Sequence, residues 1–290
     1  MSVRILGGIG EIAAAYDGII LDLWGVVHDG SRPYPGVLDA LERLKARGTR
    51  IVLLSNAPRR AAPIGERLGE IGIPARLYDA IHSSGEEVWQ NLKRRDDPFY
   101  AALGRRCYLI GPTRDEGMIE GVDLERVGDV AAAAFILNTG PWGWDETTAG
   151  YEDVLQEARR HDLPMVCANA DLVVVHRGRR VICAGALAER YAALGGRVRW
   201  HGKPFPSVYA TCLALLGVAD RRRVLAIGDS LRTDVAGARG AALDCVWVVG
   251  GIHGEELGLA PGEAPDRVRI EAALAAIGEA PLAAIAGLRW

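Results

Sequence analysis

Short apolar runs alternate along the chain with longer segments in which apolar residues recur every three or four positions. The short runs have the length and the Val, Ile and Leu content of buried parallel strands, and the longer segments are typical of helices that cover a sheet. In the outer parts of the chain, the predicted strands are 18–23, 50–54, 223–227 and 244–249. The predicted helices are 36–47, 61–71, 207–216 and 233–239. The pattern therefore predicts an α/β fold built on a Rossmann-like, mainly parallel sheet.

The middle of the chain carries its own strands and helices. Strands are predicted at 106–110, 132–138 and 165–168, and helices at 151–160 and 186–194. These are enough for a smaller α/β unit inserted into the first. We therefore expect a core formed by residues 1–83 and 201–290, and an inserted domain formed by residues 84–200. The stretch from Gly254 onward, helical and alanine-rich after Glu271, is expected to pack on the core.

Composition excludes several classes of function. With 290 residues, 49% of them hydrophobic, the chain is long enough for two units with proper cores. A formal net charge of -3 offers no overall positive field for nucleic acid or for an anionic membrane. The apolar runs are too short to span a bilayer, and the N-terminus has no secretory pattern. The five cysteines are scattered singly and are expected to be small core residues of a cytoplasmic protein.

Polar clusters occur at four places where open α/β sheets bind ligands. Asp22 interrupts the first apolar run, where a carboxylate is costly to bury unless a cation or hydrogen-bond donors surround it. Ser55 and Asn56 follow the second run directly, and they offer hydroxyl, amide and backbone donors to an anion. Each of these two clusters also has an ordinary explanation as a turn or a helix cap.

The other two clusters lie in the C-terminal third of the chain. Lys203, in the triplet Gly-Lys-Pro, carries an ammonium group of the kind that neutralises a phosphate. Asp229 and Asp234 belong to the segment Gly-Asp-Ser-Leu-Arg-Thr-Asp, which begins at a strand end. Two carboxylates around such a turn suit a hard divalent ion such as magnesium. The competing interpretations are a solvated lysine and an acidic turn with a helix cap.

Taken together and in this order, the four clusters resemble the motifs of the haloacid-dehalogenase (HAD) superfamily. The insert is similar to that of the class IIA members, which include nucleotide, pyridoxal-phosphate and phosphoglycolate phosphatases. The likeness extends to Ile-His-Ser-Ser-Gly-Glu at 81–86, Ala-Asn-Ala-Asp at 168–171 and Ala-Gly-Ala at 184–186. The resemblance implies a HAD-like hydrolase core and an inserted class IIA cap that closes over the active site and selects the leaving group.

The resemblance also implies a role for each matching residue. Asp22 would be the nucleophile that forms an aspartyl phosphate, and also a magnesium ligand. Ser55, Asn56 and Lys203 would bind phosphate, with Lys203 also serving catalysis as the charge neutraliser. The implied function is Mg²⁺-dependent hydrolysis of a small phosphorylated metabolite such as a nucleotide, sugar or vitamin phosphate.

Asp229 and Asp234 would complete the metal site, together with the backbone carbonyl of Trp24. Trp24 stands where phosphatases of this family carry a second aspartate, which protonates the leaving group and then activates water. The carbonyl of Trp24 can still bind magnesium, but its side chain cannot transfer a proton. General acid–base catalysis of this kind is worth about 10²–10⁴-fold in rate.

Three functions stay open because of this substitution. The chain is expected to be a phosphatase for good leaving groups, a catalytically impaired phospho-ligand-binding protein, or a metal-independent dehalogenase-like hydrolase. Asp229 and Asp234 argue against the dehalogenase, since carboxylates near Asp22 would repel it without a cation. His28 has a suitable pKa for a surrogate base, but a turn histidine is the commoner explanation.

Two loops of the insert are candidates for substrate contact. Trp142 and Trp144 lie on a Gly/Pro-rich turn, and their rings are of the kind that stacks on planar groups. His176 and Arg177 belong to a basic loop that would suit an anionic substrate. Packing of the insert or a subunit contact is the commoner explanation for the two tryptophans, and a solvated turn is the commoner explanation for the basic loop. A homodimer formed through the cap is a further expectation that the sequence leaves open.

Overall fold

The computed structural model describes residues 3–176, 179–254, 257–258 and 266–290. The chain divides into two compact units. The first unit consists of residues 1–55, 62–82 and 203–290, and the second of residues 56–61 and 83–202. The predicted boundaries lie near 83 and 200 and leave the short segment 56–61 in the core, whereas in the structure this segment belongs to the second unit.

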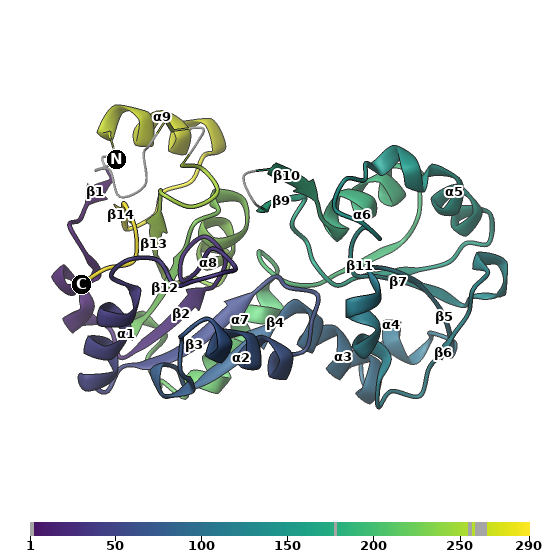
Figure 1. The fold of residues 1–290 in the computed structure, drawn as a ribbon, viewed down its shortest axis with the longest axis horizontal. Coiled ribbons are helices and arrows are strands. Elements are labelled where there is room, and N and C mark those ends of the chain that lie inside the picture. Colours follow the sequence, from purple (N-terminus) through teal and green to yellow (C-terminus); the bar gives the residue numbers. More distant parts are fainter. Residues whose placement is uncertain (1–2, 177–178, 255–256, 259–265) are drawn as a thin grey trace. The chain divides into compact units, whose positions relative to one another are not determined.

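The first unit is built on a seven-stranded sheet in the order β1-β14-β13-β12-β2-β3-β4 (Figure 1). Its strands are β1 (Arg4–Ile5), β2 (Gly18–Asp22), β3 (Arg50–Ser55), β4 (Ala80–Ser83), β12 (Val224–Gly228), β13 (Asp244–Val248) and β14 (Ala283–Ile285). From β1 to β3, neighbouring strands pair in parallel. The predicted α/β fold class is therefore confirmed.

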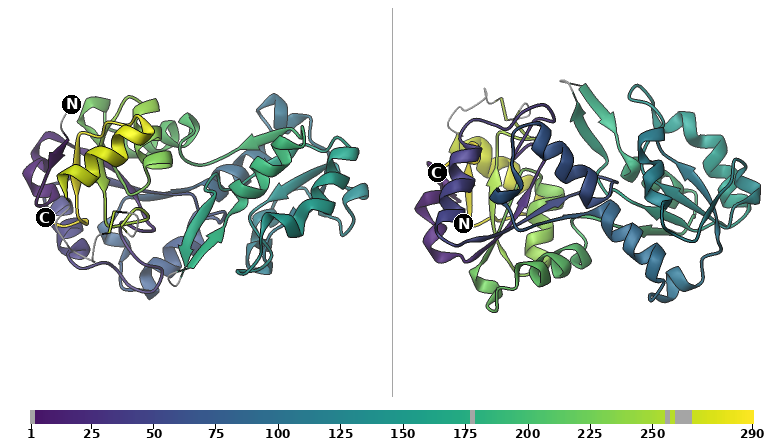
Figure 2. Two further views of the ribbon diagram at one scale, coloured as in Figure 1. Left: turned by 90° about the horizontal axis from the view of Figure 1, so that it is seen from above. Right: turned by 60° about the horizontal axis from the view of Figure 1, so that its bottom comes forward.

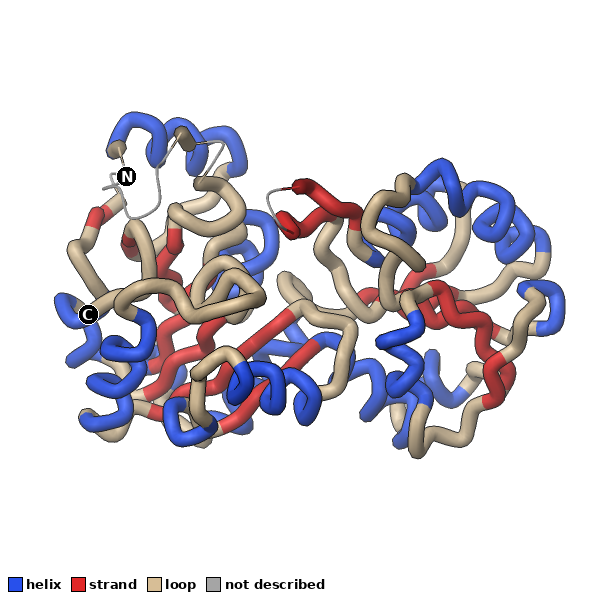
Figure 3. Tube along the Cα trace, viewed as in Figure 1, coloured by secondary structure: helices blue, strands red, loops and turns tan. Residues whose placement is uncertain are grey.

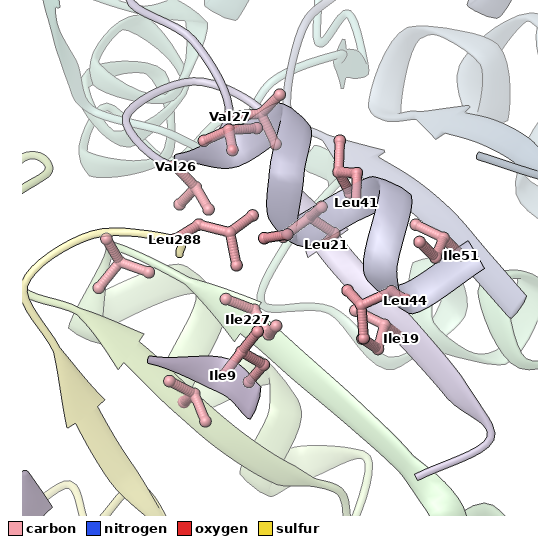
Figure 4. Close-up of a cluster of buried hydrophobic side chains, with 14 of the residues drawn as sticks. Ile9, Ile19, Leu21, Val26, Val27, Leu41, Leu44, Ile51, Ile227 and Leu288 are labelled. Atoms are coloured by element: carbon pink, nitrogen blue, oxygen red, sulfur yellow. The ribbon is translucent and has the colours of Figure 1, made fainter. Parts of the chain in front are cut away.

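Helices cover both faces of this sheet (Figure 3). They are α1 (Val37–Ala46), α2 (Ala61–Glu70), α7 (Pro206–Leu216), α8 (Ala236–Gly240) and α9 (Arg267–Ile277). Side chains alternate along a strand, so each strand serves two cores. Ile19 and Leu21 of β2 share one cluster with Leu41 and Leu44 of α1 (Figure 4), whereas Ile20 belongs to the cluster on the other face, with α7.

The second unit has a parallel sheet in the order β11-β8-β7-β5-β6. These strands are β5 (Arg106–Ile110), β6 (Glu125–Arg126), β7 (Phe135–Asn138), β8 (Met165–Cys167) and β11 (Val198–Trp200). Its helices are α3 (Ser84–Arg94), α4 (Pro98–Ala101), α5 (Glu152–Arg160) and α6 (Ala184–Ala193). Helices α3 and α4 cover one face of the sheet, and α5 and α6 cover the other (Figure 2). Their apolar side chains form a separate core on each face. An antiparallel hairpin, β9 (Val173–His176) and β10 (Arg179–Ile182), precedes α6.

Three predicted elements differ from the structure. The strand predicted at 132–138 begins only at Phe135, because Asp129 caps a short 3-10 turn over Val130–Ala132. The helix predicted at 233–239 is a π-helical turn, Leu231–Val235, that continues as α8. The predicted helical C-terminus is wrong beyond α9, since Ala283–Ile285 pair with β1 and β13 as the buried strand β14.

The structure also bears on two expectations that were drawn from the composition. All five cysteines lie in the described part of the chain, are buried and form no disulfide, as expected of core residues. Among the residues that the structure describes, no helix combines the length and the apolar character needed to cross a membrane.

Candidate active site

The carboxyl ends of β2, β3 and β12 lie side by side at one edge of the first sheet. Leu54 of β3 pairs with Asp22, and Ile227 of β12 pairs with Leu21. Ser55 and Asp229, which follow shortly after these partners, therefore leave the sheet at the same edge as Asp22. The order of strands reverses here, because β3 lies on one side of β2 and β12 on the other. Such a switch point is where open α/β sheets bind ligands.

Three carboxylates meet at this edge. One oxygen each from Asp22, Asp229 and Asp234 lies within 4.8 Å of the other two, and all three residues are buried. The ammonium of Lys203, also buried, donates to Asp22 Oδ1 at 2.5 Å and to Asp234 Oδ1 at 2.8 Å. The structure thus brings together four residues from three separate sequence motifs. With all four groups ionised, three negative charges face one positive charge.

This concentration of negative charge shifts the ionisation of the carboxylates. Burial raises the pKa of Asp22 to about 7; the neighbouring Lys203 acts against this rise, and Asp234 adds to it. Burial raises the pKa of Asp229 well above its ordinary value, and repulsion from Asp22 and Asp234 contributes in the same direction. A divalent cation would relieve both effects, because it favours the charged form of each carboxylate.

Asp229 is held in place by hydrogen bonds and by two glycines that lie close to its carboxylate. The backbone N–H of Ile252 donates to its Oδ2 at 2.7 Å, and its own carbonyl accepts from Trp247 Nε1 at 2.8 Å. Gly25 and Gly251 both approach the carboxylate so closely that a Cβ on either would overlap it. Gly25 also has a φ of +84°, a conformation that favours glycine. The cradle therefore accepts a carboxylate only because these two positions carry no side chain.

Asp234 is held in a similar way. The backbone N–H of Ser230 donates to its Oδ2 at 3.1 Å, and the hydroxyl of Tyr209 donates to its carbonyl at 3.2 Å. A Cβ on Gly228 would overlap the Asp234 carboxyl group, and one on Gly237 would approach the Tyr209 ring within 2.5 Å. These supporting residues were not predicted, since nothing in a single sequence shows which glycine or aromatic ring touches a distant carboxylate.

The donor set fits magnesium. Magnesium prefers hard oxygen ligands, and three carboxylates are available at this edge of the sheet: Asp22 at the end of β2, and Asp229 and Asp234 in the segment that follows β12. Their positions are fixed by backbone donors and by glycines rather than by the ion alone. The backbone carbonyl of Trp24 stays a predicted fourth ligand.

Trp24 and His28 both lie in the loop that follows β2. The Trp24 side chain is 36% exposed; its ring meets His28 edge to face at 5.6 Å and lies over the Cα of Gly30. His28 is buried, and its Nδ1 accepts from the backbone N–H of Gly30 at 2.9 Å. Burial lowers the pKa of His28 to about 4. These contacts favour the structural explanation of His28 over the role of a surrogate base.

The two predicted phosphate-binding residues divide between the units. Ser55 is buried at the end of β3 in the first unit, whereas Asn56 is buried in the second unit. The Asn56 Nδ2 donates to Asp171 Oδ1 at 2.8 Å. Asp171 belongs to the predicted motif at 168–171, but no role was predicted for its carboxylate.

The two candidate tryptophans of the second unit are each 43% exposed. Trp142 stacks on Tyr151 with ring centroids 4.5 Å apart, and its backbone N–H donates to the Tyr151 hydroxyl at 2.6 Å. The guanidinium of Arg114 lies 4.5 Å from the centre of the Trp144 ring. Both rings thus have intramolecular packing partners, and a substrate contact stays a prediction.

The basic loop is only partly visible. His176 pairs with Arg179 through the backbone of the β9–β10 hairpin. The side chain of His176, and Arg177 as a whole, lie outside the described residues. Arg179 forms an ion pair with Asp145 at 2.7 Å.

Comparison with known proteins places the chain in a family. The sequence pattern of the haloacid dehalogenase-like hydrolases matches residues 19–125, and a second HAD-like pattern matches residues 200–273. A hydrolase of the haloacid dehalogenase-like family from Brucella suis has a solved structure with a TM-score of 0.82 and 31% sequence identity. The match covers 98% of this chain and all of that chain.

Several similar proteins are named as phosphatases. D-glycerol 3-phosphate phosphatase from Mycobacterium tuberculosis is 26% identical over 84% of this chain, which spans 65% of that protein's length. A solved structure of the mycobacterial glycerol phosphate phosphatase contains magnesium; its TM-score is 0.65 at 23% identity, over 86% of this chain and 71% of that chain. 4-Nitrophenylphosphatase from Schizosaccharomyces pombe is 24% identical, over 85% of this chain and 88% of that protein. From its motifs, its fold and these relatives, this chain belongs to the haloacid dehalogenase-like hydrolases.

Proposed function

We propose that this chain is a magnesium-dependent phosphomonoester hydrolase that works through an aspartyl phosphate on Asp22. The observation that carries the proposal is the buried group of Asp22, Asp229 and Asp234, with Lys203 bonded to two of them. Carboxylates alone suit a cation, but a lysine on the candidate nucleophile adds the positive charge that a phosphate monoester needs. The named relatives, which are phosphatases, support the same reaction class.

The residues present account for the chemistry. Asp22 attacks the phosphorus; a bond forms between its oxygen and phosphorus while the ester P–O bond breaks, and the leaving group departs with the electron pair. Lys203 offsets charge on the phosphoryl oxygens. Asp22, Asp229 and Asp234 would hold magnesium, which when bound supplies charge neutralisation for the substrate and the carboxylates. Water then cleaves the aspartyl phosphate and restores the Asp22 carboxylate.

Trp24 restricts the range of phosphate esters that the protein is expected to hydrolyse. An indole neither protonates a leaving oxygen nor activates water, so the favoured substrates are those whose leaving group needs no proton. Aryl, enol and acyl phosphates belong to this class. The same observation favours the second candidate function, a protein that binds a phosphorylated ligand with little turnover.

The remaining roles follow from the proposal. Ser55 and Asn56 would contact the phosphate, and the second unit would act as the cap that excludes water and selects the leaving group. Trp142, Trp144, His176 and Arg177 are candidate contacts of that group.

Steady-state phosphate release from an aryl phosphate, with magnesium and with EDTA, tests the proposal. We expect slow release that needs magnesium and is abolished in Asp22→Asn. Asp17→Asn is the matched control, because Asp17 lies just before the same strand but is exposed and pairs with Arg223. No release across a broad panel of phosphates would favour the binding protein, and metal-independent release of halide from 2-halo acids would favour the dehalogenase.

A further inference from the structure

The segment 56–61 directly follows β3 and is held by other residues of the second unit. The hydroxyl of Ser84 and the backbone N–H of Gly85 both donate to the carbonyl of Ala57 at 3.2 Å. The hydroxyl of Ser83 donates to the carbonyl of Arg59 at 2.5 Å. A Cβ on Gly85 would overlap the backbone of Arg59. The motif at 81–86 therefore holds the chain just beyond the predicted phosphate-binding pair.

Asp171 holds the first residue of this segment. Its carboxylate Oδ1 accepts from Asn56 Nδ2 at 2.8 Å. The Asp171 backbone is itself fixed, since its N–H donates to Asn169 Oδ1 at 2.8 Å and its carbonyl accepts from the N–H of Gly185 at 3.1 Å. A Cβ on Gly185 would overlap the Asp171 carbonyl. The motifs at 168–171 and 184–186 therefore act together, because both hold Asp171 in place with its carboxylate beside Asn56.

The orientation of the Asn56 amide follows from these contacts. An ionised carboxylate only accepts hydrogen bonds, so the amide nitrogen must face Asp171. The opposite side of the amide lies against Gly202, whose φ of +97° favours glycine and where a Cβ would overlap Asn56 Oδ1. A half-turn of the amide would set its oxygen against Asp171. Two oxygens that cannot donate would then face each other, which disfavours the flipped form.

We propose that Asp171 is a positioning residue for phosphate binding: it accepts one N–H of the Asn56 amide and so fixes the amide in the orientation that presents its second N–H, and not the carbonyl oxygen, to a phosphate. The inference rests on the proposed function, in which Asn56 binds phosphate.

The inference predicts a graded effect of substitution at Asp171. Asp171→Ala leaves the amide of Asn56 able to turn, and a hydrogen bond to a charged group is lost. The affinity for inorganic phosphate should fall by about 10- to 100-fold, the range such bonds support. Asp171→Asn keeps an acceptor oxygen of the same reach and should recover much of this loss. Asp145→Ala is the matched control, because Asp145 is an exposed aspartate of the same unit that pairs with Arg179.

Calorimetric binding of inorganic phosphate to the magnesium-loaded full chain tests the inference through a double-mutant cycle. We expect Asn56→Ala and the double variant with Asp171→Ala to bind phosphate equally weakly, because Asp171 acts only through Asn56. An unchanged affinity in Asp171→Ala, or an equal loss from Asp171→Ala with and without Asn56, would overturn the inference and leave the proposed function intact. Absence of phosphate binding by the unsubstituted chain would overturn both.

Discussion

Gly25 lies directly against the carboxylate of Asp229. Its φ is +84°, and a Cβ added to it would overlap Asp229 Oδ2. Gly25 belongs to the loop after β2, and Asp229 follows β12. This one contact therefore joins the loop that follows the candidate nucleophile to the candidate metal ligand.

Gly25→Ala should weaken magnesium binding. The added methyl must displace Asp229, and the positive φ costs about 1–2 kcal/mol for a residue with a side chain. Gly48→Ala is the matched control, because Gly48 has a φ of +80° and a Cβ added there would meet nothing within 4 Å. Urea unfolding without metal should show a loss in both variants, whereas magnesium titration should show a weaker affinity in Gly25→Ala alone. Equal magnesium affinities in the two variants would contradict the explanation that Gly25 leaves room for the Asp229 carboxylate.

Lys203→Met should destabilise the metal-free protein by about 3–5 kcal/mol, the usual cost of removing one partner from a buried ion pair. Lys203 Nζ contacts Asp22 and Asp234, and all three side chains are buried. Magnesium should recover part of the loss because it replaces the missing positive charge. Urea unfolding with and without magnesium measures both effects.

Lys45→Met is the control for that substitution. Lys45 pairs with Asp79 at 2.7 Å, but both side chains are partly exposed. The expected loss is about 1 kcal/mol or less. Similar losses at Lys203 and Lys45 would contradict the electrostatic account of the site.

The metal-free protein should lose stability as the pH rises above about 6.5. The pKa of Asp22 rises on folding from 3.8 to about 7. In this window the folded state binds more protons than the unfolded state, so the free energy of unfolding falls with increasing pH. The pKa of His28 falls on folding from 6.5 to about 4, and its effect has the opposite sign but ends near 6.5. Asp229, whose pKa burial also raises, acts with Asp22.

Chemical unfolding from about pH 6.5 to about pH 8, in EDTA and in magnesium, measures this slope. Asp22→Asn should reduce the slope, because the substituted group does not titrate and the contribution of Asp229 remains. Magnesium should stabilise the protein more at the upper end of the range, where it displaces fewer protons. A slope in EDTA that is the same in Asp22→Asn would show that Asp22 does not cause it.

Trp24→Asp should raise the turnover of alkyl phosphates by roughly 10²-fold or more, and that of aryl phosphates less. The new carboxyl group supplies the proton that a poor leaving group needs. Trp24→Asn removes the same ring from Gly30 and His28 without adding an acid, and it isolates the proton transfer from the loss of packing. Steady-state kinetics on both substrate classes measures the ratio; the same gain for both classes, or a gain in Trp24→Asn, would contradict the missing-acid explanation.

The sequence predicted the sheet of the first unit well where strands are continuous apolar runs. The predicted strands at 18–23 and 50–54 differ from β2 and β3 by one residue at one end. The strand β14 could not be predicted from the sequence, because Ala-Ala-Ile within an alanine-rich stretch favours a helix. Only pairing with β1 and β13 makes it a strand, and such long-range pairing leaves no local signal.

The candidate site also divides into residues that the sequence predicts and contacts that it does not. Asp22 interrupts an apolar run and Asp229 follows one, so the pattern marks both positions. Lys203 and Asp234 were predicted from the motifs that resemble those of the family. The parts that fix them were not, since the contacts that matter join residues far apart in the chain. Trp247 and Tyr209 donate to the backbone carbonyls of Asp229 and Asp234, two of the three candidate metal ligands, and Asp171 holds Asn56 across 115 positions. Only the folded structure brings these pairs together.

The central claim is that Asp22 carries the phosphoryl group, and rapid-mixing kinetics tests it most directly. With Trp24 unable to activate water, the aspartyl phosphate should form faster than it hydrolyses. An aryl phosphate mixed with the magnesium-loaded protein should give a burst of phenolate close to one equivalent, with the mass of one phosphoryl group added to the Asp22 peptide after acid quenching. Phosphate release without any phosphoryl group on that peptide, or a burst that persists in Asp22→Asn, would contradict the claim.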